Sequence, residues 1–250
     1  MRPLLLLTCA PALLFAQFNT QLSPKTTAAF DQYQKTAEGK FTWKARYPQI
    51  RPGEVKIDPA NGDGSNGVGD GLVHDWVAAT LVRGATVGQV LAVLQNYPSY
   101  KTVYSPEIID SKVISHNSGT RWQVGLKIQK TKVITVVLNG EFDVEYRELG
   151  PGRWSKTSRS TRLVEMDDNR ELPPGTGHGF LWRLNAYWLI EQRAEGVYFE
   201  CRSLSLSRDV PFLLGPIVRP FVSGLPRESL QQTMDATVRA LRAERPAVAE

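Results

Sequence analysis

The 250-residue chain is poor in the residues that build cross-links and metal centres, with two cysteines and three histidines. No histidine stands at a spacing from another histidine, a cysteine or an acidic residue that is typical of a metal site, so no metal is expected. The sequence also lacks the G-x-S-x-G motif of serine hydrolases and the P-loop of nucleotide-binding proteins. We therefore assign no catalytic residue and no cofactor from motifs.

Dense runs of lysine and arginine are missing as well. The formal net charge is +5, and the basic residues are scattered along the chain. This pattern favours mild attraction to anionic lipid or acidic ligands. Without a basic cluster or a nucleic-acid motif, no nucleic-acid partner is expected.

The first 16 residues resemble a secretory signal. Arg2 precedes a short leucine- and alanine-rich stretch that ends at Ala16, where polar sequence begins. This stretch is shorter than the roughly 20 apolar residues of a membrane-spanning helix. We expect a signal peptide over 1–16 and a periplasmic or secreted protein; the alternative is a buried N-terminal helix. Cleavage would remove Cys9 and leave Cys201 alone, so core burial rather than a disulfide would have to stabilise the fold.

Residues 17–71 form a predicted N-terminal extension. A helical pattern covers 18–39 and irregular sequence follows over 41–55. The stretch 61–71 contains five glycines flanked by Asn and Asp, which predicts a flexible loop and a boundary before the main domain at 72–245. Its G-x-G-x-x-G match lacks the strand before it and the helix after it that dinucleotide binding requires. Its acidic residues do not follow the calcium-loop spacing.

The main domain reads as a strand, a short helix, a run of strands and a long final helix. A strand is predicted over 72–83, and a helix over 86–94 has Thr86 as N-cap. Turn signals separate six further strands, which favours an antiparallel meander. These strands are predicted at 107–115, 120–129, 132–149, 153–166, 178–192 and 197–208.

The last helix is predicted over 226–243, with one apolar stripe formed by Leu230, Met234, Val238 and Leu241. The segment 211–225 before it is strongly apolar but is broken by proline and glycine. Packing beneath the helix is the plain interpretation of this segment. A mobile gate that touches a membrane surface is the alternative.

Two strands carry polar residues in a notable pattern. In 180–190 both alternating rows are largely apolar, which predicts a strand covered on both faces, with Arg183 and Tyr187 among its polar interruptions. Glu200 is the nearby acid expected to pair with Arg202 or Arg183. The strand 153–166 is unusually polar, so it is either solvent-exposed or has one row facing a ligand chamber.

This order of elements resembles the START / polyketide-cyclase-like (SRPBCC, helix-grip) superfamily over about 72–245. The local match is the helix and the aromatic-Pro-x-aromatic turn at 85–100. Segments 180–188 and 204–211 further resemble uncharacterised exported bacterial members. The resemblance implies an α+β helix-grip fold, a curved antiparallel β-sheet wrapped round a long C-terminal helix. It also implies an apolar cavity that holds lipids, sterols, quinones or polyketides.

Our prediction is an exported protein that binds a lipid or other hydrophobic small molecule between the sheet and the last helix. The predicted ligand-binding residues are Trp122, Trp182, Arg183, Tyr187, Glu200, Arg202, Met234 and Val238. The remaining wall is predicted to consist of Val124, Leu126, Leu184, Trp188, Leu230 and Leu241. One alternative is a cyclase- or dehydratase-type enzyme that uses Tyr187, Glu200 or His178 as acid–base groups. The other is an envelope protein-interaction module with a filled core.

Overall fold

The computed structural model describes residues 20–131, 135–209 and 215–243, with the backbone alone described for 215–223. The predicted signal peptide 1–16 lies outside the described residues, and so does 211–214 of the predicted gate. None of the described helices is long and apolar enough to cross a membrane.

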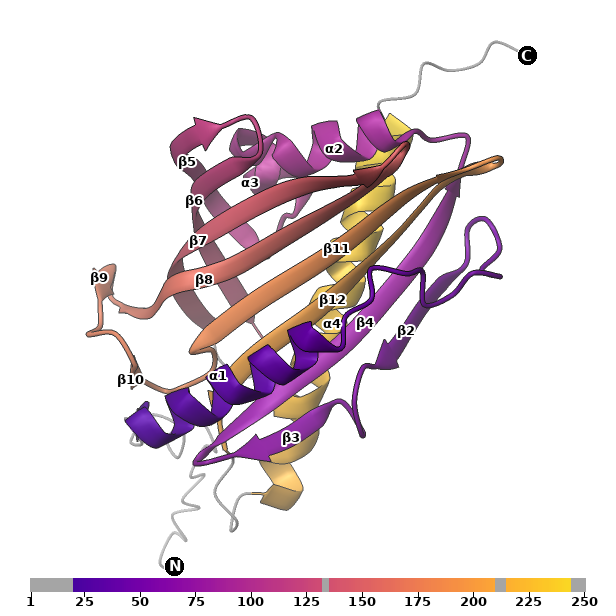
Figure 1. Ribbon diagram of the computed structural model, residues 1–250. Helices are drawn as coiled ribbons and strands as arrows, with labels where there is room; N and C mark the ends of the chain where they lie inside the picture. The colour runs from indigo at the N-terminus through magenta and orange to yellow at the C-terminus, as the bar shows by residue number, and fades with distance from the viewer. Residues whose placement is uncertain (1–19, 132–134, 210–214, 244–250) are drawn as a thin grey trace, which may run out of the picture.

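One large antiparallel sheet dominates the described chain (Figure 1). Its strands follow the order β2-β4-β12-β11-β8-β7-β6-β5, with β3 added to β4 and β9 added to β8. The bounds are β2 Val55–Pro59, β3 Ser65–Val68, β4 Gly71–Arg83, β5 Ile108–Ser118, β6 Arg121–Thr131, β7 Thr135–Gly150, β8 Arg153–Asp167, β9 Arg170–Glu171, β11 Arg183–Arg193 and β12 Gly196–Arg208. Strands β1 (Thr20–Gln21) and β10 (Thr176–Gly177) form a separate pair. The six-strand meander is confirmed, and so is the predicted strand over 72–83, which is β4 and precedes α2 (Val87–Gln95).

The helices are α1 Pro24–Gly39, α2 Val87–Gln95, α3 Tyr100–Val103 and α4 Gly215–Ala243, with a 3-10 turn at Tyr97–Ser99. Thr86 caps α2 as predicted: its hydroxyl accepts from the N–H of Gln89, whose side chain bonds back to the Thr86 N–H. The final helix begins at Gly215 rather than at 226. The expectation that proline and glycine would keep 215–225 irregular is therefore wrong, because each proline removes only one backbone hydrogen bond and Pro216 lies in the first turn.

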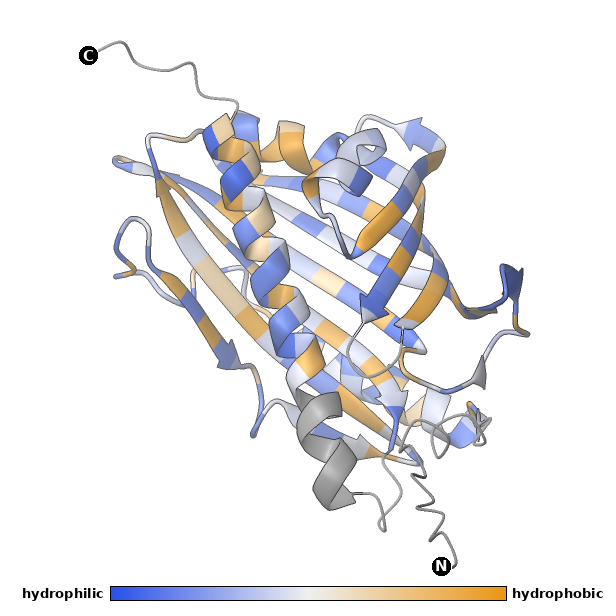
Figure 2. Cartoon of the chain, turned by 180° about the vertical axis from the view of Figure 1, so that it is seen from behind, coloured by the Kyte–Doolittle hydropathy of each residue, from blue (hydrophilic) through white to orange (hydrophobic). Residues whose placement is uncertain are grey.

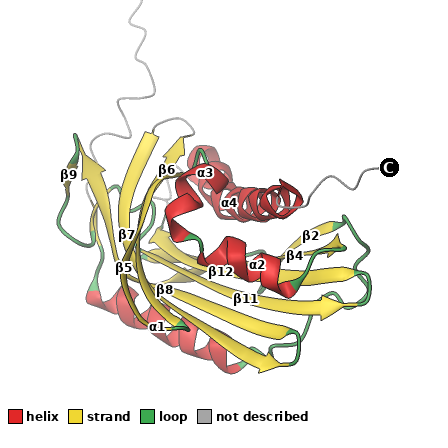
Figure 3. Cartoon of the chain, turned by 90° about the horizontal axis from the view of Figure 1, so that it is seen from above, coloured by secondary structure: helices red, strands yellow, loops and turns green. Residues whose placement is uncertain are grey.

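The sheet is the middle layer of the molecule. Seen from above, its concave inner face is crossed by α4 and closed at one end by α2 and α3, while α1 lies on the opposite, outer face (Figure 3). This is an α+β helix-grip architecture. Hydrophobic positions on the strands lie behind α4 in Figure 2. On α4, Leu230, Met234 and Leu241 are buried in the inner cluster and Val238 is partly buried beside them.

The N-terminal extension covers much of the outer face. Phe30 of α1 is buried against Val73 and Leu206, and Ile50 is buried against Leu81 in a second outer cluster. The loop expected over 61–71 contains β3, whose register on β4 brings the extension into the main sheet. Apolar packing on both faces explains why so many strand residues are buried in both alternating rows.

Candidate ligand-binding site

The two-residue period of β11 sorts its side chains onto opposite faces of the sheet. Leu184, Ala186 and Trp188 join the inner cluster beneath α4. Tyr187 belongs to the outer cluster with Phe30. Arg183 has the same parity as Tyr187 and donates to the Trp182 carbonyl at 2.9 Å. The prediction that the polar residues of this strand face the chamber is therefore corrected, because the outer row is the polar one.

The predicted charge pair is also corrected. Arg202 binds Asp75 of β4 through two hydrogen bonds of 2.7 and 2.6 Å, and Asp75 is fully buried. Glu200 instead accepts from the Tyr198 hydroxyl and from the backbone N–H of Arg46 at 2.9 Å. Asp75 is the diagonal cross-strand neighbour of Arg202 on the outer face, so it reaches the guanidinium before Glu200 can.

The predicted ligand-binding set thus divides between two faces. Trp122, Met234 and Val238 lie on the inner face. Trp182 is buried in the outer cluster. The other predicted wall residues all belong to the inner cluster, and they are Val124, Leu126, Leu184, Trp188, Leu230 and Leu241.

The most unusual group on the inner face, the amine of Lys156, is not among the residues predicted from the sequence. This side chain on β8 is 6% exposed, and its Nζ donates to the Tyr100 hydroxyl at 3.3 Å. Four aromatic rings surround it with centroids 5.7–5.9 Å away, those of Tyr97, Tyr100, Tyr146 and Trp188. Among the described residues no carboxylate forms an ion pair with Lys156.

The surroundings of Lys156 compensate its charge in part. Tyr100 and Tyr146 both donate to the carbonyl of Leu94 at 2.6 Å, in the last turn of α2. The carbonyl end of a helix carries partial negative charge, which favours a cation near it. Burial nevertheless lowers the pKa of Lys156 to about 8, with the neighbouring Cys201 opposing that shift. A buried amine with one hydrogen bond keeps donors available for a ligand.

Beside Lys156 the inner face carries a row of small side chains. Ser158, Ala186 and Ser203 are cross-strand neighbours on β8, β11 and β12, and all three are half-buried on the inner face. The next row contains Lys156, Trp188 and Cys201, and these are buried. The small row therefore leaves accessible surface on the inner face, directly next to the amine.

The polarity of 153–166 is the sequence signal for Lys156, since one alternative for this strand has a polar row that faces the chamber. Because Lys156 pairs with Trp188 in register, a residue that reads as solvent-exposed in isolation lies among aromatic rings. The four aromatic neighbours come from the turn at Tyr97–Ser99, from α3, from β7 and from β11, elements that are separate in sequence. Only the sheet topology brings these aromatic residues together around Lys156.

The hydrogen bonds of His74 and His178 go to groups other than Lys156. His74 is buried and bonds to the Ser65 hydroxyl at 3.1 Å and to the Ser207 hydroxyl at 3.0 Å. His178 contacts the buried carboxylate of Glu165, Nδ1 to Oε2, at 3.0 Å. No group of three or more metal-ligating side chains occurs among the residues that the structure describes.

His74 makes a prediction for acid stability. Burial lowers its pKa from 6.5 to about 4, so between these values the unfolded chain holds a proton that the folded chain does not. Stability must then fall as the pH falls, by roughly 1.5 kcal/mol from pH 6.5 to pH 5 for this group alone. Urea unfolding of the wild type and of His74→Gln at both pH values measures this. The variant should lose less stability than the wild type across that interval; equal losses would contradict the assignment.

The fold, with its curved antiparallel sheet and its long C-terminal helix, is of the START/SRPBCC-like helix-grip class. Comparison with solved structures agrees: human STARD10 superposes with a TM-score of 0.50 at 8% identity, covering 92% of this chain and 84% of that one. A STAR-related lipid transfer protein fragment from Xanthomonas axonopodis gives a TM-score of 0.48 at 16% identity, covering 72% of this chain and 99% of that one. At such identities the likeness concerns the fold alone. No protein-family model and no curated protein sequence matches the chain.

Proposed function

We propose that this protein binds a hydrophobic small molecule or lipid between the inner face of the sheet and α4. The observation that carries the proposal is the half-buried row of Ser158, Ala186 and Ser203 on the inner face of the sheet. Small side chains on a face of otherwise large apolar residues leave room for a ligand, and the partly buried Leu126 and Leu184 give it an apolar lining. The helix-grip class supports this location.

The polar end of the ligand is proposed to meet Lys156. The amine lies one row from the small side chains and has donors to spare. A carboxylate or another acceptor group would complete its hydrogen bonding and supply the missing counter-charge. The ligand class is therefore an apolar molecule with an acidic or acceptor end group, and Lys156 takes the anchoring role that Arg183, Tyr187, Glu200 and Arg202 were predicted to have.

Export through the 1–16 signal and a gate at 211–225 belong to the same proposal. Both rest on the sequence: the signal pattern at the N-terminus, and the strongly apolar composition of the segment before the last helix. A carrier in the periplasm or outside the cell would exchange its ligand at a membrane surface. The formal net charge, +5 for the full chain and one less, +4, once Arg2 is removed with the signal, favours contact with anionic lipid there.

Filling the proposed chamber tests its existence. Ala186→Trp should reduce the affinity for a fluorescent fatty acid at least tenfold, because the indole would occupy the space above the small row. Ala45→Trp is the matched control, since Ala45 packs against the outer face. Ala186→Leu is a milder variant in case the larger one fails to fold. Unchanged affinity in both folded Ala186 variants, or no binding by the wild type, would contradict the proposal.

The anchoring role of Lys156 has its own readout. Lys156→Met should weaken binding of oleate at least tenfold while leaving the binding of oleyl alcohol within a few-fold, since only the carboxylate needs the amine. Fluorescence displacement with the two probes provides the comparison. An equal loss for both probes would assign Lys156 a packing role only.

A further inference from the structure

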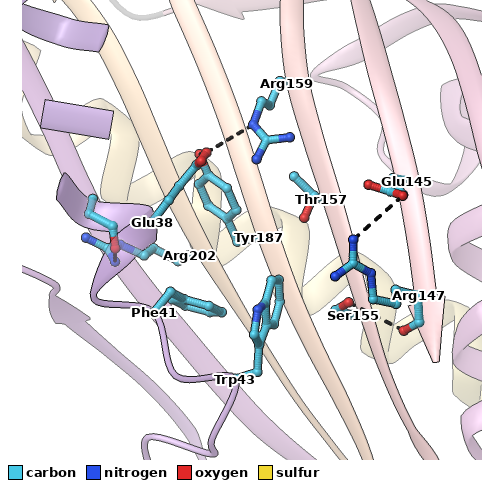
Figure 4. Close-up of a pocket in the computed structure, with 11 residues that line it drawn as sticks. Glu38, Phe41, Trp43, Glu145, Arg147, Ser155, Thr157, Arg159, Tyr187 and Arg202 are labelled. Atoms are coloured by element: carbon cyan, nitrogen blue, oxygen red, sulfur yellow. Dashed lines mark hydrogen bonds and ion pairs between the residues drawn. The ribbon is translucent and has the colours of Figure 1, made fainter. Parts of the chain in front are cut away.

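A hollow lies on the outer face, on the far side of the sheet from α4 (Figure 3). It has a volume of about 220 Å³ and is bordered by the end of α1, by the following loop and by β7, β8, β11 and β12 (Figure 4). Side chains from the N-terminal extension, including Glu38, Phe41 and Trp43, form one wall. The extension therefore builds a site that the sheet alone would not have.

This hollow continues along the sheet. A neighbouring hollow of about 420 Å³ extends toward β5 and β6, and the two share Glu145, Thr157 and Arg159 as lining residues. Strand register explains the continuity: Arg121, Glu145, Thr157, Tyr187 and Arg202 are successive cross-strand neighbours in one row. Five strands at the usual spacing of about 4.8 Å give this row a length of about 19 Å. We call it the outer groove.

One end of the outer groove is aromatic. Phe41 and Trp43 meet edge to face with ring centroids 4.4 Å apart, and Phe41 lies 6.1 Å from the Tyr187 ring. Trp43 adopts a left-handed backbone conformation with a φ of 51°, and its carbonyl accepts from Arg153 at 2.8 Å. A tryptophan rarely takes this conformation, so the surrounding contacts hold it in place at the groove.

The rest of the groove is polar and nearly balanced in charge. Arg159 pairs with Glu38 at 3.0 Å, and Arg121 pairs with Glu145 at 3.3 Å. Burial would raise the pKa of Glu38, but hydrogen bonds from Arg159 and Tyr187 outweigh it and lower that pKa, so the carboxylate is ionised at neutral pH. A full anion would meet Glu38 and Glu145, and a full cation would meet the guanidinium groups.

Donors and acceptors for a ligand remain available in these pairs. The hydrogen bond from Arg159 to Glu38 uses Nε, and the two terminal nitrogens together carry enough donors for a ligand beside the contact with Tyr187. The carboxylate of Glu145 has further lone pairs, and the Thr157 hydroxyl lies on the floor between them. Groups that both donate and accept, such as hydroxyls, match this surface best.

From this juxtaposition we propose that the outer groove binds a neutral carbohydrate chain. The apolar face of a sugar ring packs on Trp43 and Phe41, and its hydroxyls bond to the alternating guanidinium and carboxylate groups. The hollow beside Trp43 is smaller than the roughly 300–1,000 Å³ of sites for drug-sized ligands, so it holds a single ring. The continuation past Thr157 holds the next rings of the chain.

Isothermal titration calorimetry on the full chain tests this site with four probes. These are glucose, N-acetylglucosamine and the β-1,4-linked trisaccharide of each. At least one trisaccharide should bind at least tenfold tighter than its monosaccharide, because it occupies both parts of the groove. Benzoate serves as a planar anionic probe and should not bind here. Absence of binding by all four sugars, or binding of benzoate that Trp43→Ala abolishes, would overturn the proposal.

Variants then place the sugar in the groove. Trp43→Ala should weaken trisaccharide binding at least tenfold, and Thr157→Val should weaken it several-fold without changing the fold. The matched control is Tyr47→Ala, an aromatic residue of the same extension that does not line the groove. Sugar affinity that stays at the wild-type level in both groove variants would overturn the assignment. Ala186→Trp should leave sugar binding unchanged, so failure of the inner chamber and failure of this groove are separable.

Discussion

Asp75→Ala is expected to destabilise the protein by about 3–5 kcal/mol. Asp75 is fully buried on β4 and accepts from Arg202 at 2.7 and 2.6 Å and from the Tyr33 hydroxyl at 3.0 Å. Removing the carboxylate leaves the guanidinium of Arg202 without its counter-charge in a mostly buried position. Urea unfolding at pH 7 should show the loss as a lower midpoint with an unchanged slope.

A double-variant comparison separates the pair from its surroundings. Asp75→Ala combined with Arg202→Met should be less destabilised than the sum of the two single variants, because the uncompensated charge is gone. Glu54→Ala, which breaks exposed pairs with Arg51 and Lys56, is the control and should leave the midpoint unchanged. Additive single effects would mean that Asp75 and Arg202 contribute independently.

Lys156→Met should stabilise the protein by about 3 kcal/mol at pH 7. The amine is buried among aromatic rings, and burial lowers its pKa from 10.5 to about 8. Both the folded and the unfolded chain carry the charge below pH 8, so the folded state bears the full cost of burying it there. Methionine has a similar length without that charge.

The pH dependence gives the same prediction a second readout. Above pH 8 the folded wild type loses the proton while the unfolded chain keeps it until about 10.5, so wild-type stability should rise by about 1 kcal/mol from pH 7.5 to 9. From about pH 8.5 this rise is partly offset, because burial raises the pKa of Cys201 from 9.0 to about 12, so its thiol ionises only in the unfolded chain and favours unfolding by about 0.5 kcal/mol at pH 9. Burial also raises the pKa values of Tyr97, Tyr100 and Tyr146. Ionisation of these tyrosines in the unfolded chain lowers the stability mainly above pH 10.

The variant should show no such rise between pH 7.5 and 9. Lys101→Met, at an exposed lysine of α3, is the control and should follow the wild type. A Lys156→Met protein that is less stable than the wild type would mean that its contacts with the rings and with Tyr100 outweigh the burial cost. If Lys156→Met gains stability and loses oleate binding, Lys156 is a polar group that is retained for binding at a cost in stability.

Much of the fold was predictable because its signals are local. The two-residue period fixed the strands, the turn residues fixed the meander, and Thr86 with Gln89 marked the start of α2. The start of α4 was not predictable, since proline and glycine read as breakers at 215–225 although the helix tolerates them. The apolar stripe from Leu230 to Leu241 was correctly expected to be buried.

Which row of a strand faces α4 could not be predicted where both rows are apolar. In β11 the aromatic residues Trp188 and Tyr187 are both buried, one on each face, because α1 covers the outer face. The polar residues were therefore assigned to the chamber when they in fact meet the extension. The burial of Lys156 could not be predicted either, because its neighbours are residues that only the sheet topology brings together.

The central claim is that an apolar ligand occupies the space between the sheet and α4. Native mass spectrometry of the full protein, purified gently from its own membrane fraction, tests it most directly. We expect an added mass on the wild-type protein that is absent from Ala186→Trp. Organic extraction should identify the bound species as an apolar molecule with an acidic or acceptor end group. A protein that always carries the bare mass of its chain, and that binds no fluorescent fatty acid, would contradict the claim.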